Sequence, residues 1–482
     1  MLRRPLIAAI LSASLSAGLG VGCGGGRPAP APPRSADLDP EGSHQAAVAA
    51  AVQPYLDAEL LSGLVVGLYD AGRREIYGFG KGPGGAAPDG GSLFELGTLT
   101  RVYTGLLLAD ALQRRELELD TPVAEYLPPG VTVPTRDKVA ITLRHLALHG
   151  SGLPPLPPSL AAKASAADPL AGYDEEALYR DLARTPVLFT PGTAIQPSIY
   201  GIGLLGFVLG KKAGAGFPRA LEARVLQPLE LRDTMLAVPA AAAARRMVGT
   251  DDELAPVPPW SWGALAGAGG LVSSARDQLR LIEAELDAAA GGKNLPLRHQ
   301  MRLTQEPQLE TGAASAAGSD TGSDTGADNV GLGWMIDGTG RYWHSGGTAG
   351  FRAFVGFDPK TKRGVVALAS TSSPLVDRLA RALFALFDEA PPKPWTAPTP
   401  AQLATYAGSY DFAGTRLAVV ATGKRLYLEV PSEPRVRLLP VSDHEFWIEA
   451  LGAVAIFQAD GGKIARIVFG VGTRQVIAPR VE

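Results

Sequence analysis

The fold is decided by the stretch Phe94-Glu95-Leu96-Gly97-Thr98-Leu99-Thr100-Arg101. Apolar residues then recur at helical spacing as far as Leu106, which predicts a helix that begins near Leu99. Thr98 therefore stands at the start of this helix, and Arg101 follows one turn later. A helix start stabilises a developing anion, so this is a position where a nucleophile can work.

Further segments follow this stretch in a fixed order along the chain. They include Pro122-Val123-Ala124-Glu125-Tyr126-Leu127-Pro128, His149-Gly150-Ser151-Gly152-Leu153-Pro154, Phe189-Thr190-Pro191-Gly192-Thr193, Ala268-Gly269-Gly270-Leu271-Val272-Ser273-Ser274 and His344-Ser345-Gly346-Gly347-Thr348. As an ordered set, they resemble the serine β-lactamase and D,D-peptidase family over about residues 46–387. The resemblance implies an α+β fold of the β-lactamase/D,D-peptidase type, an antiparallel sheet flanked by helices plus a helical subdomain.

The first motif departs from the family pattern, which reads Ser-x-x-Lys. In the family the serine is the nucleophile, and the lysine one turn later takes its proton. The resemblance assigns these catalytic positions to Thr98 and Arg101. A threonine can be a nucleophile when a base stands beside it. An arginine cannot be that base, because its pKa lies above about 12.

The second motif is lost and the third is kept. The family places a Tyr-x-Asn motif where this chain has Pro197-Ser198-Ile199, so neither the hydroxyl nor the amide is present. The third motif, His344-Ser345-Gly346, agrees with the His-x-Gly segment of the family. The resemblance therefore implies that Pro197, Ile199, His344, Ser345 and Gly346 line a substrate-binding cleft.

Most of these residues also have a structural interpretation. Thr98 is expected to be a helix N-cap, because threonine caps well. Arg101 is expected either to form an ion pair or to fill the former lysine pocket. His344 either binds a carboxylate or packs at a strand edge, whereas His145 and His149 are expected to be structural.

Two other sets of residues have alternative interpretations. Ser198 is a substitute hydroxyl only if it has a catalytic partner, and the sequence offers none. Trp260 and Trp262 either line the rim of the cleft or pack in the core.

Composition excludes several classes of function. The net charge of −3 argues against a nucleic-acid partner. One cysteine permits no intramolecular disulfide, and six scattered histidines do not form a zinc motif. We therefore expect neither a metal nor another cofactor.

The N-terminus predicts export. Two arginines precede an apolar run, which ends at Gly22 and Cys23. A run of Gly, Pro and Ala follows, as in a flexible tether. We expect lipidation at Cys23, which would place the protein in the cell envelope as a membrane-anchored lipoprotein facing the periplasm.

The chain is expected to divide into five parts. Short apolar segments between 416 and 469 alternate with turns and predict a small all-β domain, and residues 311–329 read as a disordered insertion. The expected parts are a signal peptide (1–22), a tether (23–42), a β-lactamase-related domain (43–389), a linker (390–400) and the all-β domain (401–482).

Three functional hypotheses follow. The first is a catalytically impaired or inactive homologue that binds a small-molecule or peptidoglycan-type ligand. The second is an active hydrolase of an ester, a D-amino peptide or a β-lactam, with Thr98 as nucleophile. In the third, the C-terminal domain binds a partner or lipid and the large domain is a platform.

Overall fold

The computed structural model describes residues 42–161, 167–292, 295–310, 329–387, 395–471 and 474–481. The predicted signal peptide, Cys23 and nearly all of the tether lie outside the described residues, as do residues 311–328 of the predicted insertion. Asn329, the last residue of that insertion, pairs in a strand instead. Among the described residues, none of the helices combines the length and the apolar character that a bilayer crossing requires.

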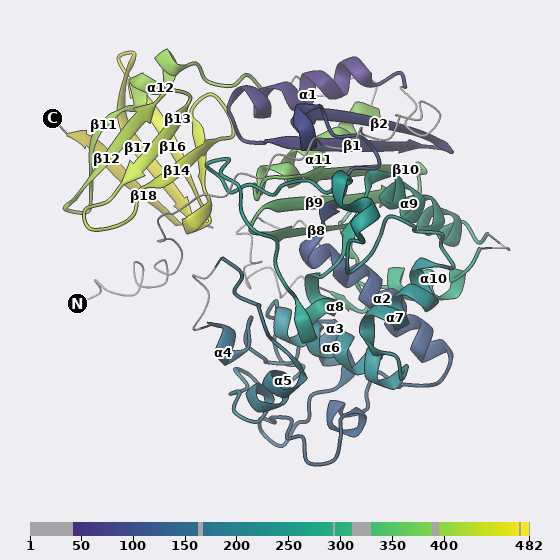
Figure 1. The fold of residues 1–482 in the computed structure, drawn as a ribbon. Coiled ribbons are helices and arrows are strands. Elements are labelled where there is room, and N and C mark those ends of the chain that lie inside the picture. The colour runs from purple at the N-terminus through teal and green to yellow at the C-terminus, as the bar shows by residue number, and fades with distance from the viewer. Residues whose placement is uncertain are drawn as a thin grey trace, which may run out of the picture.

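An eight-stranded antiparallel sheet is the centre of the large domain (Figure 1). Its strand order is β2-β1-β10-β9-β8-β7-β6-β5. The strands are β1 (Gly63–Asp70), β2 (Arg73–Gly80), β5 (Leu309–Glu310), β6 (Asn329–Val330), β7 (Met335–Ile336), β8 (Tyr342–Thr348), β9 (Phe351–Asp358) and β10 (Arg363–Ala369). A separate pair joins β3 (Phe94–Glu95) to β4 (Val272–Ser273).

Helices cover both faces of this sheet because its strands are apolar on both sides. In β1, Val65 belongs to the same core cluster as α9 (Ala275–Ala289). The next residue, Val66, belongs to the cluster of α1 (Gln45–Asp57) and α11 (Leu375–Phe384). Successive strand residues point to opposite faces, so the sheet lies between these two helical layers.

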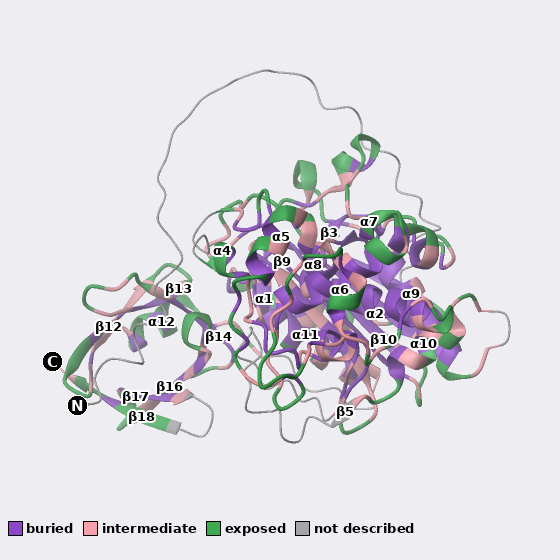
Figure 2. Ribbon diagram, turned by 90° about the horizontal axis from the view of Figure 1, so that it is seen from below, coloured by how far each residue is buried: buried purple, intermediate pink, exposed green. Residues whose placement is uncertain are grey.

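A helical subdomain extends from the α9 side. It is built around α2 (Thr100–Gln113) and α6 (Ile199–Lys212), whose residues are mostly buried, as Figure 2 shows. The remaining helices of the large domain are α3 (Leu143–Ala147), α4 (Pro158–Ala161), α5 (Glu175–Leu182), α7 (Gly216–Leu221), α8 (Ala266–Gly269) and α10 (Arg298–Gln305).

The C-terminal domain is a closed barrel preceded by α12 (Pro400–Tyr406). Its strands are β11 (Gly408–Phe412), β12 (Thr415–Thr422), β13 (Arg425–Glu429), β14 (Val436–Pro440), β15 (Glu445–Ile448), β16 (Ala453–Asp460), β17 (Lys463–Val471) and β18 (Arg474–Val481). Aromatic side chains fill the interior, among them Tyr410, Phe446 and Phe457. A partner of this domain would therefore have to contact its outer surface.

The predicted fold class, an antiparallel sheet flanked by helices with a small all-β domain, is confirmed. Gly331 and Trp334 close a turn between β6 and β7. A capping box at Thr142 starts α3. The sequence did not predict α12.

A buried carboxyl group lies between α9 and α10. The side chain of Glu285 is fully buried and accepts hydrogen bonds from Gln305 Nε2 at 2.5 Å and from Trp334 Nε1 at 3.4 Å. Among the described residues, no cation lies within ion-pair distance of it. Burial raises the pKa of Glu285 to about 8.

We expect Glu285→Gln to remove a pH-dependent loss of stability. The folded pKa of about 8 exceeds the ordinary value of 4.5, so the folded state binds more protons between these values. The free energy of unfolding therefore falls as the pH rises through this window. Urea unfolding at pH 5, 6.5 and 8 measures the free energy of unfolding of both proteins. The value for the variant should rise relative to that of the parent as the pH increases, by more than about 1 kcal/mol at pH 8. A difference that does not change with pH would contradict this.

Candidate active site

Close backbone packing positions Thr98 beside β8. Thr98 lies in a short 3-10 turn, Gly97–Leu99, which leads directly into α2. Gly97 has a φ of +52°, and a Cβ on it would lie 2.3 Å from the carbonyl oxygen of Gly347. A Cβ on Gly346 would lie 2.4 Å from the backbone nitrogen of Leu99. Only glycines permit this approach.

The Thr98 side chain is not the predicted helix N-cap. The capping position of α2 is Leu99, which has no side-chain cap. The hydroxyl of Thr98 instead donates to the carbonyl oxygen of Ser345, at a long 3.4 Å. This side chain is half-buried, so part of it is accessible to solvent. The prediction of a cap was wrong because the 3-10 turn shifts the helix start past Thr98.

Arg101 is a buried cation that lacks a carboxylate partner among the described residues. Its side chain is 5% exposed, and Nη2 donates to the carbonyl oxygen of Ala147 at 2.9 Å. Ala147 ends α3, so this carbonyl has no donor within the helix. The Nε of Arg101 is buried and has no acceptor in the described part of the chain. Within the described residues the side chain thus forms no ion pair, and the alternative in which it fills the former lysine pocket stays a prediction.

The charge of Arg101 determines the electrostatics of the site. Burial lowers the pKa of Arg101 to about 10, so the guanidinium remains protonated at neutral pH. Burial first, and the Arg101 charge second, lower the pKa of His344 to about 3. The same two causes hold the pKa of His149 well below its usual value. Both histidines are therefore neutral at pH 7, and a base is most effective when its pKa lies near the operating pH.

Each histidine also has a defined hydrogen bond. His344 contacts the carbonyl oxygen of Ser345 through Nδ1 at 2.6 Å, so Nδ1 carries the proton. Nδ1 of His149 accepts from the backbone N–H of Ser198 at 3.2 Å, so its proton is on Nε2. This bond agrees with the structural role predicted for His149. The position of His149 beside Arg101 and His344 was not predicted.

The second motif contributes no catalytic group. Pro197 and Ile199 are half-buried on either side of Ser198. Ser198 caps α6, because its hydroxyl accepts from Gly201 N–H at 2.9 Å and donates to Pro154 O at 2.7 Å. It is a helix cap. Of the two tryptophans, Trp262 is buried in the core and its ring lies against Gly269.

Arg352 of β9 connects β8 to α11, and the sequence did not indicate this role. It forms a buried ion pair with Asp377 of α11 at 2.6 Å. Its other contact is with the Ser345 hydroxyl, at 3.5 Å. Buried pairs of this kind fix geometry more than they add stability. The signal in the sequence is only that Arg352 follows the third motif by a few residues.

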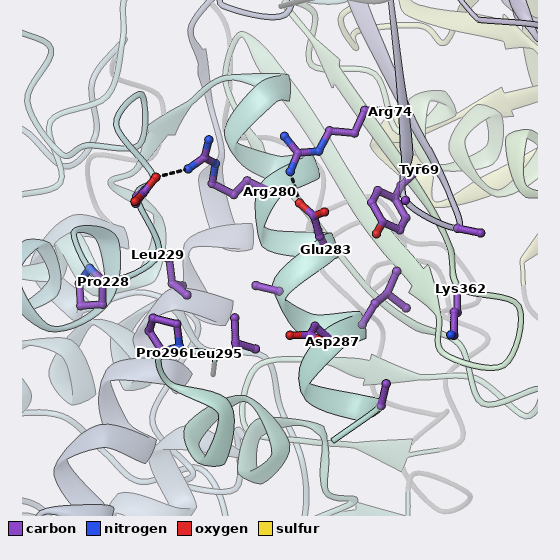
Figure 3. Close-up of a pocket in the computed structure, with 16 residues that line it drawn as sticks. Tyr69, Arg74, Pro228, Leu229, Arg280, Glu283, Asp287, Leu295, Pro296 and Lys362 are labelled. Atoms are coloured by element: carbon purple, nitrogen blue, oxygen red, sulfur yellow. Dashed lines mark hydrogen bonds and ion pairs between the residues drawn. The ribbon is translucent and has the colours of Figure 1, made fainter. Parts of the chain in front are cut away.

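A cavity of about 720 Å³ lies away from these residues, between the β1–β2 hairpin and α9 (Figure 3). Its charged groups are largely paired with one another: Arg74 contacts Glu283, and Arg280 contacts Glu230 at 2.7 Å. None of the motif residues lines it. Within the described ranges, no three His, Cys, Asp or Glu side chains gather as metal ligands.

Comparison with known proteins identifies the family. The β-lactamase family model matches residues 48–389. The chain therefore belongs to the β-lactamase family. It is 27% identical over 312 residues to a β-lactamase of Escherichia coli K12, which covers 59% of this chain and 76% of that protein. It is also 27% identical over 322 residues to the D-alanyl-D-alanine-carboxypeptidase/endopeptidase AmpH of the same strain, with coverage of 65% and 80%.

Two solved structures share the fold. A β-lactamase/D-alanine carboxypeptidase from Yersinia pestis, complexed with citrate, aligns with a TM-score of 0.61 at 23% identity and covers 71% of this chain and 98% of its own. An octameric penicillin-binding protein homologue from Pyrococcus abyssi aligns with a TM-score of 0.62 at 17% identity, covering 88% and 98%. The second likeness extends beyond the region of the family model.

We expect Arg101→Met to raise the pKa of both His149 and His344. Removing the cation removes the second cause of their lowered pKa, while burial still keeps both values below 6.5. NMR titration of the imidazole nitrogens in parent and variant measures the two shifts. His145, whose lowered pKa has other named causes, is the internal control. Identical titrations of His149 and His344 in the two proteins would show that Arg101 does not act on them.

Proposed function

We propose that this protein is an exported, catalytically impaired member of the β-lactamase family that binds a ligand in its cleft. The observation that carries the proposal is Arg101. The base position one turn after Thr98 holds a buried guanidinium that is protonated at neutral pH. Loss of a general base alone typically costs about 10²–10⁴-fold in rate.

The groups around Thr98 support impairment. Within the described part of the chain, its hydroxyl forms one hydrogen bond, to a backbone carbonyl, which cannot accept and hold a proton. The neutral His344 has a pKa of about 3 and is a weak base. Pro197 and Ile199 supply no proton shuttle or amide contact. Among the described residues, the groups around Thr98 thus favour the interpretation that it is not activated as a nucleophile.

The same site favours an anionic ligand. Burying a cation without a carboxylate partner costs free energy. A ligand carboxylate near Arg101 would therefore interact with it more strongly than it would with the same cation in water. Peptidoglycan-type peptides and citrate both carry such groups, and citrate is present in the Yersinia pestis structure. A small carboxylate or a peptidoglycan peptide is therefore the ligand class we propose.

The second candidate is an active hydrolase that uses Thr98 on an ester, a D-amino peptide or a β-lactam. The observation in its favour is that relatives across the same region are named as enzymes. It requires the half-exposed Thr98 to find a base other than Arg101, such as His344 or a bound water.

Acylation distinguishes the two candidates. We expect no adduct at Thr98 with a fluorescent penicillin or a fluorophosphonate, and no turnover of ester, D-amino-peptide or β-lactam substrates, because no group can deprotonate the hydroxyl. Intact-protein mass spectrometry and substrate assays give the two readouts. The matched variant is Thr98→Ser with Arg101→Lys, which should acylate slowly without rapid turnover. An adduct mapped to Thr98, or turnover lost in Thr98→Ala, would establish the second candidate instead.

We further propose that Cys23 anchors the protein to the envelope membrane. It is the only cysteine of the chain and follows an apolar run. Cells fed an alkyne fatty acid should label the parent and not Cys23→Ser, which should leave the membrane fraction. A membrane-bound Cys23→Ser protein would contradict lipid anchoring at this residue.

A further inference from the structure

The cavity between the β1–β2 hairpin and α9 has an apolar side and a charged side (Figure 3). Its volume of about 720 Å³ lies within the range of sites that hold small molecules. Leu229 is buried, and Leu295 packs against the main core cluster of the large domain. With these two, the apolar side consists of Pro228, Leu229, Leu295 and Pro296. A ligand that fills the cavity therefore needs an apolar group.

Two ion pairs link the walls of this cavity. Arg74 of β2 contacts Glu283 of α9, so this pair joins the hairpin to the helix. Arg280 of α9 contacts Glu230 at 2.7 Å, so the second pair joins the helix to the segment that carries Leu229. These four charges compensate one another, and they leave little net charge for a ligand to meet.

Lys362 and Asp287 are the two charged lining residues that remain. Both are exposed, and within the described ranges neither forms an ion pair. The backbone of Lys362 is held beside the β1–β2 turn, because its carbonyl accepts from Ala71 N–H at 3.0 Å. Asp287 follows Glu283 by one turn of α9, so both carboxylates face the same cavity. A ligand at this rim therefore meets one cation and one anion.

Tyr69 adds a neutral hydrogen-bond donor to the charged side. It is 7% exposed and lines the cavity, and its hydroxyl points into this space in Figure 3. Burial first, and the charge of Glu283 second, raise the pKa of Tyr69, so the phenol keeps its proton at neutral pH. A protonated hydroxyl in this position can donate to a carbonyl oxygen of a ligand.

We propose that this cavity is a second ligand site, which takes a short zwitterionic peptide with apolar side chains. Lys362 receives the carboxylate of the peptide, and Asp287 receives its ammonium group. An anion without an ammonium group would be repelled by Asp287, and a cation without a carboxylate would be repelled by Lys362. None of the motif residues lines the cavity, so the site does not depend on the function proposed for the cleft.

Three dipeptides that differ in one charge each test this assignment. Leucyl-leucine carries both charges, leucyl-leucinamide lacks the carboxylate, and N-acetyl-leucyl-leucine lacks the ammonium group. Isothermal titration calorimetry on the full chain at pH 7 measures the Kd of each. We expect leucyl-leucine to bind severalfold more tightly than either derivative, because only the zwitterion satisfies both rim charges.

Two rim variants assign each charge to its partner. Lys362→Met should abolish the preference for leucyl-leucine over leucyl-leucinamide, and Asp287→Asn should abolish the preference over N-acetyl-leucyl-leucine. Both residues are exposed, so both variants should fold, and thermal unfolding checks this. The matched controls are Lys424→Met and Asp460→Asn, which remove exposed charges from hairpins of the barrel. They should leave all three Kd values unchanged.

Three results would overturn the second site. The first is that the dipeptides bind alike, or not at all at millimolar concentration. The second is that both rim variants keep the preferences of the parent. The third is that Arg101→Met abolishes binding while the rim variants keep it, because this would place the dipeptide in the cleft. Each of these results would leave the proposed loss of catalysis standing, and acylation of Thr98 would leave the second site standing.

Discussion

The backbone contact between β8 and the start of α2 is the constraint on which the site depends. Gly97 and Gly346 let a strand and a helix start approach until their main-chain atoms touch. This approach places the Thr98 hydroxyl against the carbonyl of Ser345 and brings the charge of Arg101 within electrostatic reach of His344. A side chain at either glycine would separate the sheet from the helical subdomain and open the site.

Within this frame, one substituted side chain changes the chemistry of its neighbours. A lysine can lose its proton when it is buried, and so can serve as a base. Arg101 keeps its charge at neutral pH, and burial first, with that charge second, keeps both His149 and His344 neutral. The site thus has one fixed cation and two uncharged imidazoles, an arrangement that suits binding an anion better than moving a proton.

The sequence predicted the scaffold through the ordered set of motifs that the chain shares with the family. The helix α2 and the short strands of the C-terminal domain also follow from apolar spacing and from turn residues. The site was predicted only in part. Periodicity cannot show that the 3-10 turn displaces Thr98 from the cap, or that His149 meets Arg101 across 48 residues of chain. Arg352 belongs to no motif, since its role arises only from tertiary packing.

The structure also explains how such a fold keeps its motif segments in place when catalytic side chains are replaced. These segments are held by glycine backbones, by the Arg352–Asp377 pair and by the cap at Ser198. None of these contacts uses the functional group of a nucleophile or a base. The replacement at position 101 is itself accommodated, because the free carbonyl at the end of α3 partly compensates the buried charge. Folding and chemistry therefore depend on different atoms of the same motifs. The catalytic chemistry can be lost while the fold is preserved.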